Sequence, residues 1–329
     1  MLKDSFGRTV NYLRLSVTDR CDFRCVYCMT EEMEFLPRQQ LLTIEEMTRI
    51  SQAFVELGVK KIRITGGEPL IRRNITALFE NVGKLDDLDE ITLTTNGSQL
   101  SPDTCNKLVD AGVKRINISL DSLQAQRFKA LTRTGQLSQV LAGIDNARGA
   151  GLNVKLNSVI LKNRNSDEIA ALVDFAVSKQ CDISFIEEMP LGVISEHERQ
   201  EEFISSETIR DTIEKHYTLN REDVAISTAG PSRYWQIKHH ASRVGFISPH
   251  SDNFCSSCNR VRLTATGQLL LCLGNEDNVD LRKVIREYPG DVTRLKNTIM
   301  NAMQIKPEKH EFNLAQAPQI LRFMNTTGG

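Results

Sequence analysis

Six of the eight cysteines in the 329-residue sequence fall into two groups of three. The first trio is Cys21, Cys25 and Cys28, and the second trio is Cys255, Cys258 and Cys272. Grouped thiolates are typical ligands of zinc and of iron–sulfur clusters, so both trios are candidate metal sites. The other two cysteines, Cys105 and Cys181, fall within predicted regular elements, and we expect them to be buried packing residues.

The start of the chain indicates the compartment in which these thiols work. Residues 1–10 contain Lys3, Asp4 and Arg8 and no apolar core, so we do not expect a secretory signal. No run approaches the roughly 18 consecutive apolar residues that cross a bilayer. We therefore expect a cytoplasmic protein that does not contact a membrane. In a reducing compartment, metal binding or catalysis is a better use of cysteine than disulfide formation.

The composition is that of an ordinary globular protein. Forty per cent of the residues are hydrophobic and 25% are charged, with 41 Lys and Arg against 42 Asp and Glu. These values exclude disordered, collagen-like and small disulfide-stapled classes. The formal net charge of −1 gives no global attraction to nucleic acid, so we expect no nucleic-acid partner. The length allows one large domain or two unequal ones.

The first trio suits a metal centre that keeps one position open. Three thiolates need a fourth ligand to close a structural zinc site. Three cysteines can instead bind three irons of a 4Fe-4S cluster, which leaves the fourth iron open to an outside ligand. Zinc with a distant fourth residue and a chance grouping are the alternatives. Chance is the weakest of the three, because Tyr27 directly precedes the last cysteine and the trio follows a predicted strand.

Strand-like and helix-like segments alternate between about residues 9 and 190. The predicted strands are Asn11–Val17, Lys61–Thr65, Glu90–Thr95, Lys114–Leu120, Asn153–Ile160 and Asp182–Glu187. The predicted helices include Thr43–Leu57, Ser101–Ala111, Leu137–Gly149 and Ser166–Lys179. Repeated strand–helix units with short connections indicate parallel strands and right-handed crossovers. Six units predict an α/β fold, a partial (β/α)6 TIM-like barrel, with the first trio at the carboxyl end of the first strand, where barrel active sites lie.

Polar and apolar side chains alternate along these strands. On the first strand, for example, Arg14 lies between Leu13 and Leu15. Because successive side chains point to opposite faces of a sheet, the apolar set packs on the helices and the polar set faces the lumen. That polar set includes Arg14, Arg63, Thr94, Ser119 and Lys155. We expect a lumen that binds a polar, anionic ligand; the alternative is an exposed sheet face with solvated charges.

After residue 190 the pattern changes. A charged helix is predicted over Glu196–Lys215, followed by short strands and two further helices. The predicted strands are Val224–Ser227, Ser232–Ile237 and Val244–Ile247, then a hairpin of Val261–Thr264 and Gln268–Leu271. The predicted helices are Asp280–Glu287 and Thr293–Ala302. We place a domain boundary near residue 215, with the partial barrel in residues 1–215 and a smaller α+β domain in residues 216–329 that closes the lumen.

The first trio resembles the motif of the radical S-adenosylmethionine (SAM) enzymes, CxxxCxxC with an aromatic residue before the third cysteine, as at Tyr27. The chain also carries their Gly-Gly-Glu-Pro segment after the second strand, as Gly66-Gly67-Glu68-Pro69. The resemblance implies a 4Fe-4S cluster whose open iron binds SAM and generates a 5′-deoxyadenosyl radical. Glycines without Cβ atoms would let the cofactor approach their carbonyls.

The second trio, judged from its residues alone, fits a zinc site with a fourth ligand such as His250. Its continuation, Asn259-Arg-Val-Arg-Leu-Thr264, resembles one radical SAM subfamily, the GTP 3′,8-cyclases of molybdenum cofactor biosynthesis. The terminal pair Gly328-Gly329 belongs to the same resemblance. It implies a second 4Fe-4S cluster and the cyclisation of GTP to (8S)-3′,8-cyclo-7,8-dihydroguanosine 5′-triphosphate, a lyase reaction.

The resemblance also implies roles for single residues. Those around SAM would be Tyr27, Gly67, Ser119 and Met189. Those in contact with GTP would be Arg14, Arg63, Thr94, Lys155, Arg260, Val261 and Arg262, and Gly328 and Gly329 would assist catalysis. Two positions depart from the family, because Ser184 and Glu188 stand where an Arg and a Tyr are usual. Losing a cation and gaining an acid would weaken triphosphate binding if these side chains face it.

The resemblance also implies partners beyond GTP. They are a reductant such as flavodoxin or ferredoxin, the next pathway enzyme, cyclic pyranopterin monophosphate synthase, and a second copy of the chain in a homodimer. Two other functions stay open at this point. One is a radical SAM enzyme that modifies a peptide and carries an auxiliary cluster, and the other is a non-enzymatic zinc-binding module. The second of these leaves the polar lumen unexplained.

Overall fold

The computed structural model describes residues 1–194, 198–222, 230–316 and 318–328. The strands in these residues are β1 (Tyr12–Ser16), β2 (Lys61–Thr65), β3 (Glu90–Thr95), β4 (Arg115–Ser119), β5 (Asn153–Val159), β6 (Asp182–Ile186), β7 (Leu219–Arg221), β8 (Arg233–Ile237), β9 (Arg243–Ile247), β10 (Arg260–Leu263), β11 (Gln268–Leu270) and β12 (Asn278–Asp280). The helices are α1 (Ile44–Glu56), α2 (Ile75–Gly83), α3 (Pro102–Asp110), α4 (Ala125–Thr132), α5 (Leu137–Gly149), α6 (Ile169–Ser178), α7 (Arg199–Glu202), α8 (Ser206–Glu214), α9 (Leu281–Glu287), α10 (Val292–Met303) and α11 (Met324–Thr327).

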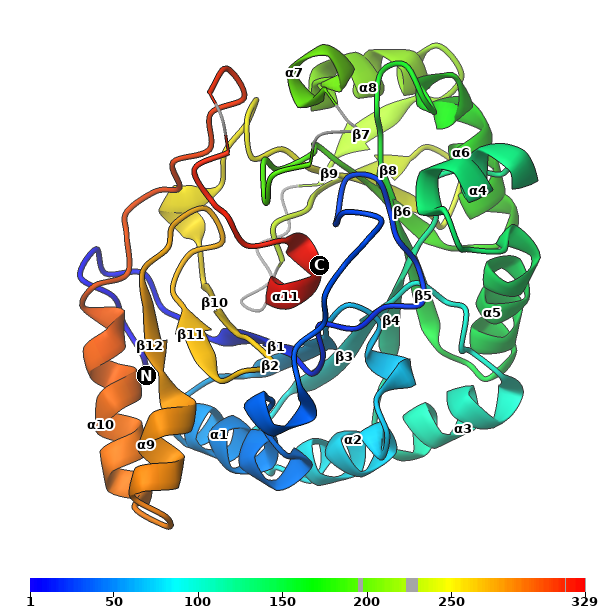
Figure 1. Ribbon diagram of the computed structural model, residues 1–329. Helices are drawn as coiled ribbons and strands as arrows, with labels where there is room; N and C mark the ends of the chain where they lie inside the picture. The colour runs from blue at the N-terminus through cyan, green and yellow to red at the C-terminus, as the bar shows by residue number, and fades with distance from the viewer. Residues whose placement is uncertain (195–197, 223–229, 317, 329) are drawn as a thin grey trace.

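The strands β1 to β6 form the predicted parallel sheet. Each pairs in parallel with the next, from β1–β2 to β5–β6. Their bounds differ from the predicted ones by at most one residue at either end. Figure 1 shows the sheet curved around a central space, with α1 to α6 in a ring outside it. Among the described residues the strand order is linear, so the structure is a partial TIM-like barrel whose sheet is not closed.

The last third of the chain covers both edges of this sheet. On one side β9 pairs in parallel with β6 and continues through β8 to β7. On the other side β10 pairs in parallel with β1 and forms the predicted antiparallel hairpin with β11, followed by β12. The order across the described sheet is therefore β12-β11-β10-β1-β2-β3-β4-β5-β6-β9-β8-β7.

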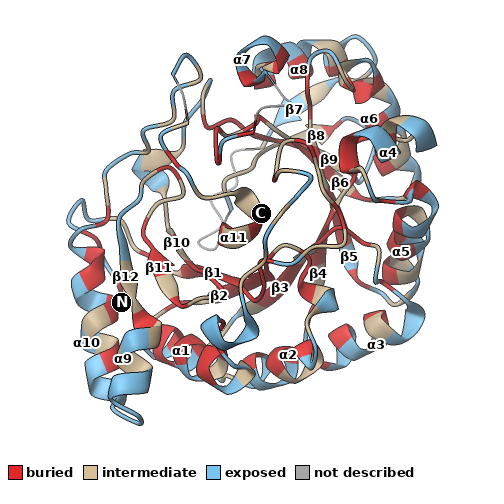
Figure 2. Ribbon diagram, viewed as in Figure 1, coloured by how far each residue is buried: buried red, intermediate tan, exposed pale blue. Residues whose placement is uncertain are grey.

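The hydrophobic core lies between the sheet and the outer helices. The helix α1 shows how the sequence forms this layer. Thr43 and Glu46 exchange hydrogen bonds in a capping box that starts the helix. Met47, Ile50 and Phe54 then recur at helical spacing and are fully buried. Figure 2 shows the same division, with buried residues on the strands and on the inner sides of the helices and exposed residues outside.

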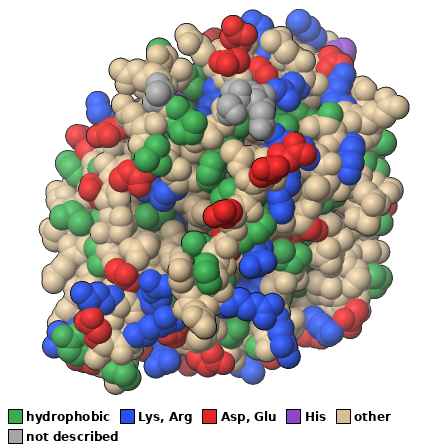
Figure 3. Space-filling view, viewed as in Figure 1, with side chains coloured by type: hydrophobic (Ala, Val, Ile, Leu, Met, Phe, Trp, Pro, Cys, Tyr) green, Lys and Arg blue, Asp and Glu red, His purple; other side chains and the backbone are tan. Residues whose placement is uncertain are grey.

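Three further features concern buried cysteines, surface charge and membrane-spanning segments. Cys105 and Cys181 are fully buried, as expected of packing residues. The face in Figure 3 mixes acidic and basic side chains, in agreement with the near-neutral composition. No helix in the described parts of the chain is long and apolar enough to cross a lipid bilayer.

The single helix predicted over Glu196–Lys215 was wrong. The described residues form two helices, α7 and α8, with Phe203 extended between them. Ser205 accepts a hydrogen bond from the backbone N–H of Thr208 and starts α8 anew, which a continuous charged pattern does not reveal. The predicted strand Val224–Ser227 lies outside the described residues. The short elements β7, β12 and α11 were not anticipated.

Candidate active site

The curved sheet and the loops at its carboxyl end enclose a cavity of about 800 Å³. The predicted residues that line it are Arg14, Tyr27, Arg63, Thr94, Ser119, Lys155, Met189, Cys255, Cys258, Arg260, Val261, Arg262 and Cys272. The predicted polar face of the strands therefore does face the lumen. The predicted residues outside this lining are Cys21, Cys25, Cys28, Gly67 and Gly328. Gly329 lies outside the described residues.

Three arginines stand side by side across the cavity wall. Arg14 on β1 is in register with Arg262 on β10 and with Arg63 on β2. Burial, opposed by Tyr12 and assisted by the charges of Arg63 and Arg260, lowers the pKa of Arg14 to about 10. Burial and the neighbouring arginines likewise lower the pKa of Arg262 well below its usual value. Like charges directly opposite one another on a sheet are unfavourable. The row is therefore suited to an anion that neutralises it.

A second row of polar residues lies one pleat away on the same face. Tyr12, Lys61 and Glu90 are in register on β1, β2 and β3. The Lys61 ammonium lies 2.6 Å from a Glu90 carboxylate oxygen, and Arg115 lies 2.8 Å from the other. Sequence reasoning missed Tyr12, Lys61 and Arg115 as cavity residues. The alternation that identified Arg14 and Arg63 would have found them, since each lies an even number of residues from a predicted member.

The first trio lies in the loop that follows β1. Its three thiols are free and partly buried. Burial, and then the neighbouring Cys28, raise the pKa of Cys25 well above the usual value, and burial raises the pKa of Cys28 to about 12. Three buried thiols of this kind do not ionise together unaided, whereas a bound cationic centre deprotonates its thiol ligands. The trio therefore fits the ligand set of a 4Fe-4S cluster.

The Gly-Gly-Glu-Pro segment holds the first trio's loop in place. The backbone N–H of Gly67 donates to the Thr18 carbonyl and that of Glu68 to the Arg20 carbonyl, both at 2.8 Å. A Cβ atom on Gly67 would lie 2.3 Å from the Arg20 carbonyl oxygen. A side chain at Gly67 is therefore excluded by the protein backbone, and not by the cofactor that we expected to approach it. The loop that leads to Cys21 already fills that space.

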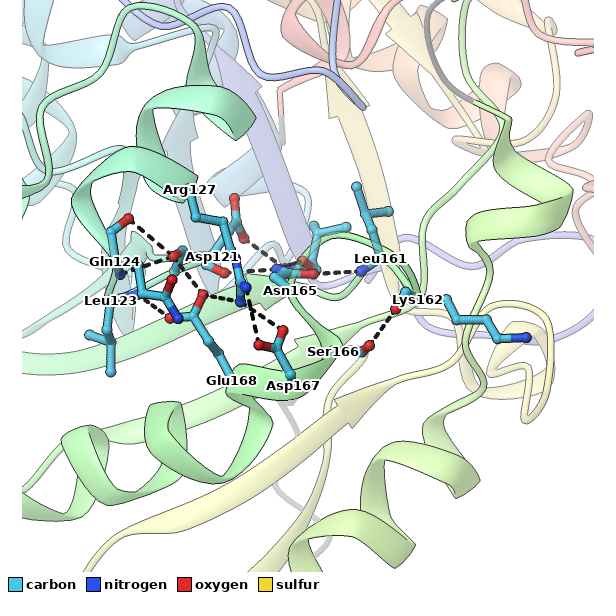
Figure 4. Close-up of polar contacts among 12 residues, drawn as sticks. Asp121, Leu123, Gln124, Arg127, Leu161, Lys162, Asn165, Ser166, Asp167 and Glu168 are labelled. Atoms are coloured by element: carbon cyan, nitrogen blue, oxygen red, sulfur yellow. Dashed lines mark hydrogen bonds and ion pairs between the residues drawn. The ribbon is translucent and has the colours of Figure 1, made fainter.

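Tyr27 is oriented by a carboxylate that sequence reasoning did not single out. Its hydroxyl donates to Asp121 at 2.6 Å, and the second oxygen of Asp121 accepts from the Val159 N–H at 2.8 Å. Burial raises the pKa of Asp121 to about 6. The segment after β4 is fixed by a buried network, shown in Figure 4, in which Asn165 donates to the Asp121 carbonyl and Glu168 accepts from Leu123 N–H. Asp121 is therefore held rigidly against the cavity.

The second trio lines the cavity. Cys255 and Cys258 flank a short turn before β10, and Cys272 follows β11. Burial opposes ionisation of Cys258, but the charges of Arg260 and Lys306 outweigh it and lower the pKa to about 7. Within the described residues no three His, Cys, Asp or Glu side chains converge to hold one metal ion. In a 4Fe-4S cluster each cysteine binds a different iron, so the ligands surround the cluster and do not converge on a single metal ion. His250, the residue considered as a fourth zinc ligand, instead pairs its ring with the Glu188 carbonyl at 2.8 Å.

Two family models match successive parts of the chain. A family model described as Radical SAM superfamily matches residues 15–176, and one described as Molybdenum Cofactor Synthesis C matches residues 181–312. The GTP 3′,8-cyclase of Pseudomonas entomophila is 59% identical over 330 residues, which cover 100% of this chain and 98% of that protein. The GTP 3′,8-cyclase of Saccharophagus degradans is 56% identical, with the same coverage. The chain belongs to the GTP 3′,8-cyclase family.

Solved structures resemble this GTP 3′,8-cyclase family member in fold. Streptococcus suis SuiB bound to its precursor peptide SuiA matches with a TM-score of 0.63 and 16% identity, over 97% of this chain and 76% of SuiB. SuiB bound to S-adenosylmethionine matches with a TM-score of 0.60 and 14% identity, over 94% and 77%. At this identity the likeness shows the radical SAM fold and carries no information about substrate.

The end of this GTP 3′,8-cyclase family chain lies inside the barrel. In Figure 1 the helix α11 sits within the ring of strands, beside the C-terminal label. The Asn325 side chain donates to the Asp19 carbonyl at 2.7 Å, and Arg262 donates to the Gly328 carbonyl. Gly328 has φ of 79°, and a Cβ there would lie 2.4 Å from Thr65. Glycine is therefore required at the point where the tail meets β2.

Both departures from the GTP 3′,8-cyclase pattern are accommodated locally. Ser184 is fully buried, and its hydroxyl pairs with that of Ser232 at 2.7 Å. Glu188 lines the cavity, but its carboxylate lies 2.9 Å from the Arg199 guanidinium in a buried ion pair. Arg199 also donates to the Leu191 and Gly192 carbonyls. The additional acid is thus balanced by a cation that the motifs did not reveal.

Removing that cation should destabilise the protein. Arg199→Met removes the guanidinium that lies beside the buried Glu188 carboxylate, and breaking a buried ion pair from one side costs about 3–5 kcal/mol. Thermal unfolding of the nucleotide-free chain should show a lower Tm for Arg199→Met than for the parent. Adding Glu188→Gln in the same chain removes the buried negative charge and should recover part of the loss. Equal Tm values for the parent and Arg199→Met would refute the ion pair.

Proposed function

We propose that the protein cyclises GTP to (8S)-3′,8-cyclo-7,8-dihydroguanosine 5′-triphosphate with SAM as cofactor. This lyase reaction is the first step of molybdenum cofactor biosynthesis. The observation that carries the proposal is the row of Arg262, Arg14 and Arg63, which crosses a cavity lined by the second trio and by Tyr27 of the first motif. A nucleoside triphosphate supplies the negative charge that such a row requires, and arginine binds phosphate oxygens in a bidentate manner.

Different residues bind GTP and SAM. Arg14, Arg63, Thr94 and Lys155 hold the triphosphate, while Arg260, Val261 and Arg262 hold the nucleotide against the second trio. Tyr27, Gly67, Ser119 and Met189 surround SAM. When bound, the first 4Fe-4S cluster would supply the electron that cleaves SAM into methionine and a 5′-deoxyadenosyl radical. The enclosed cavity keeps water and other hydrogen donors away, so that the ribose C3′ hydrogen of GTP is the one within reach.

The tail contributes Met324 to the cavity wall, and its terminal glycines assist catalysis. Gly328→Ala should displace the tail for two reasons. Alanine is strained in the left-handed backbone conformation of this residue, and its methyl group would clash with Thr65. We expect a loss of about tenfold or more in kcat, because misplacement of about 1 Å is known to have effects of that size or larger. The measurement is the rate of cyclised nucleotide formation under single-turnover conditions. Full activity after deletion of both terminal glycines would contradict a role for the tail.

The partners of the reaction follow from its chemistry. A low-potential one-electron donor, flavodoxin or ferredoxin, reduces the first cluster, and cyclic pyranopterin monophosphate synthase takes the product. The protein works as a homodimer in the cytoplasm, where a reducing environment protects clusters that have an open iron. Residues 1–215 form the radical SAM domain and residues 216–329 the domain that holds the second cluster.

One anaerobic experiment separates this function from its competitors. The reconstituted chain should contain about eight irons, the sum of two four-iron clusters. With SAM, a reductant and GTP it should form 5′-deoxyadenosine and a cyclised nucleotide in equal amounts. Zinc without iron would instead support a binding module. Formation of 5′-deoxyadenosine at the same rate without GTP, and no cyclised nucleotide, would favour modification of a peptide.

A further inference from the structure

A buried lysine contacts the second trio from outside the cysteine motif. Lys306 follows α10 and is only 2% exposed. Its ammonium lies 3.7 Å from the Cys258 sulfur and 2.6 Å from the Leu271 carbonyl oxygen. Neither partner is a carboxylate, so the charge of Lys306 is directed at a sulfur and a carbonyl. Burial of an ammonium without an acidic partner is unfavourable unless something else supplies negative charge.

The position of Lys306 is fixed by a residue from the other end of the chain. The Arg8 guanidinium donates to the Cys255 carbonyl at 2.8 Å and to the Pro307 carbonyl at 2.7 Å. It also donates to the Glu308 carbonyl at 2.6 Å. Arg8 therefore ties the loop of the second trio to the segment that directly follows Lys306. The contact between the ammonium and Cys258 is built into the fold rather than left to a flexible side chain.

Cys21 of the first trio and Cys258 of the second trio have different electrostatic surroundings. The sulfur of Cys21 accepts only from neutral groups among the described residues, the Phe23 N–H at 3.4 Å and the Asn96 amide at 3.8 Å. The sulfur of Cys258 accepts from two cations, Lys306 and the Arg260 guanidinium, the latter at 3.9 Å.

We propose that Lys306 raises the reduction potential of the second cluster through a charge-assisted hydrogen bond to its Cys258 ligand. The proposal rests on the proposed function only in requiring that a 4Fe-4S cluster occupies the second trio. Reduction adds one electron to the cluster and makes it more negative. A nearby cation stabilises the reduced state more than the oxidised state, and hydrogen bonds to cluster sulfurs are known to set such potentials.

The test is a redox titration of the second cluster alone. A full-length chain with Cys21, Cys25 and Cys28 replaced by alanine retains only the second trio, so electron paramagnetic resonance of the reduced cluster reports a single midpoint potential. Lys306→Gln removes the charge and keeps N–H donors. We expect the ratio of reduced to oxidised cluster at a fixed potential to fall about tenfold, which is a shift of about 59 mV to lower potential for one electron.

Two matched variants serve as controls. Lys306→Arg keeps the charge and should leave the potential close to that of the parent. Lys309→Gln removes the same charge from an exposed residue of the same segment and should not change it. An unchanged potential in Lys306→Gln would overturn the proposal. Loss of the cluster from Lys306→Gln, with retention in Lys306→Arg, would overturn it too, because Lys306 would then act in cluster binding.

The titration does not depend on the outcome of the GTP assay. It uses neither SAM nor GTP, so failure of the cyclisation reaction leaves the potential measurable. Iron analysis of the same samples shows whether the cluster is present. The expected shift in the chain without the first trio, together with no cyclisation of GTP by the chain that holds both clusters, would refute the proposed function and support the role of Lys306.

Discussion

Gly67→Ala should abolish the formation of 5′-deoxyadenosine and leave the chain without its first cluster. The new methyl group would lie 2.3 Å from the Arg20 carbonyl oxygen, which is backbone and cannot turn aside as a side chain would. The loop that follows must move, and it carries the cysteines of the first trio. We expect destabilisation of about 3 kcal/mol, as for strong overpacking of a core. Iron content should fall by about four per chain, the iron of one cluster.

A matched glycine provides the control for this prediction. A Cβ on Gly149, at the end of α5, would meet no atom within 4 Å. Gly149→Ala should therefore retain iron and activity and gain about 0.5–1 kcal/mol of stability, because alanine favours a helix over glycine. Iron analysis, SAM cleavage and thermal unfolding measured on both variants separate a local clash from a general intolerance of substitution. Full iron content and parental SAM cleavage in Gly67→Ala would show that the loop adapts.

Arg14→Met should weaken GTP binding and leave the nucleotide-free protein at least as stable as its parent. Arg14 is the central arginine of the row, with Arg262 on one side and Arg63 on the other. A charge-assisted hydrogen bond contributes about 1.5–3 kcal/mol, so its loss should raise the Kd for GTP by about 10- to 100-fold. Removing the central charge also relieves repulsion between neighbours, so the two effects have opposite signs.

Calorimetric titration of GTP and thermal unfolding without nucleotide measure the two effects on the same sample. Arg49→Met serves as the control, because Arg49 is exposed on α1 and lies outside the cavity. It should change neither the Kd nor the Tm by a measurable amount. If Arg14→Met lowered the Tm and left the Kd unchanged, the row would be a structural feature of the sheet and not a binding site for phosphate.

Much of the barrel and one wall of its cavity could be predicted from sequence. Period-two alternation is a local property, and a strand that buries one face displays it whatever surrounds the strand. The bounds of β1 to β6 and the orientation of Arg14, Arg63 and Lys155 toward the lumen therefore follow from neighbouring residues alone. The cysteine spacing identified both trios for the same reason, although residues alone left zinc open as the metal.

The contacts that the sequence does not reveal join distant parts of the chain. Arg199 neutralises Glu188, Arg8 reaches the carbonyl of Cys255, and Lys306 reaches the sulfur of Cys258. No motif or hydrophobic periodicity in the sequence identifies any of the three cations, because each contact forms only when the folded backbone brings distant residues together. The insertion of α11 into the barrel is of the same kind. A short segment near Gly328 has no amphipathic pattern, and its contacts with Asp19 and Arg262 give it a fixed position.

The order of the strands has a consequence for the growing chain. The six strands β1 to β6 emerge from the ribosome first, but both of their outer edges are covered by strands made later, β10 against β1 and β9 against β6. Until then the nascent barrel presents two unpaired edges, which are templates for pairing with other chains. Pairing of β1 with β10 also joins residues very far apart in sequence, and such contacts form slowly. We therefore expect residues 1–215 made alone to aggregate, and the full chain to depend on chaperones during synthesis.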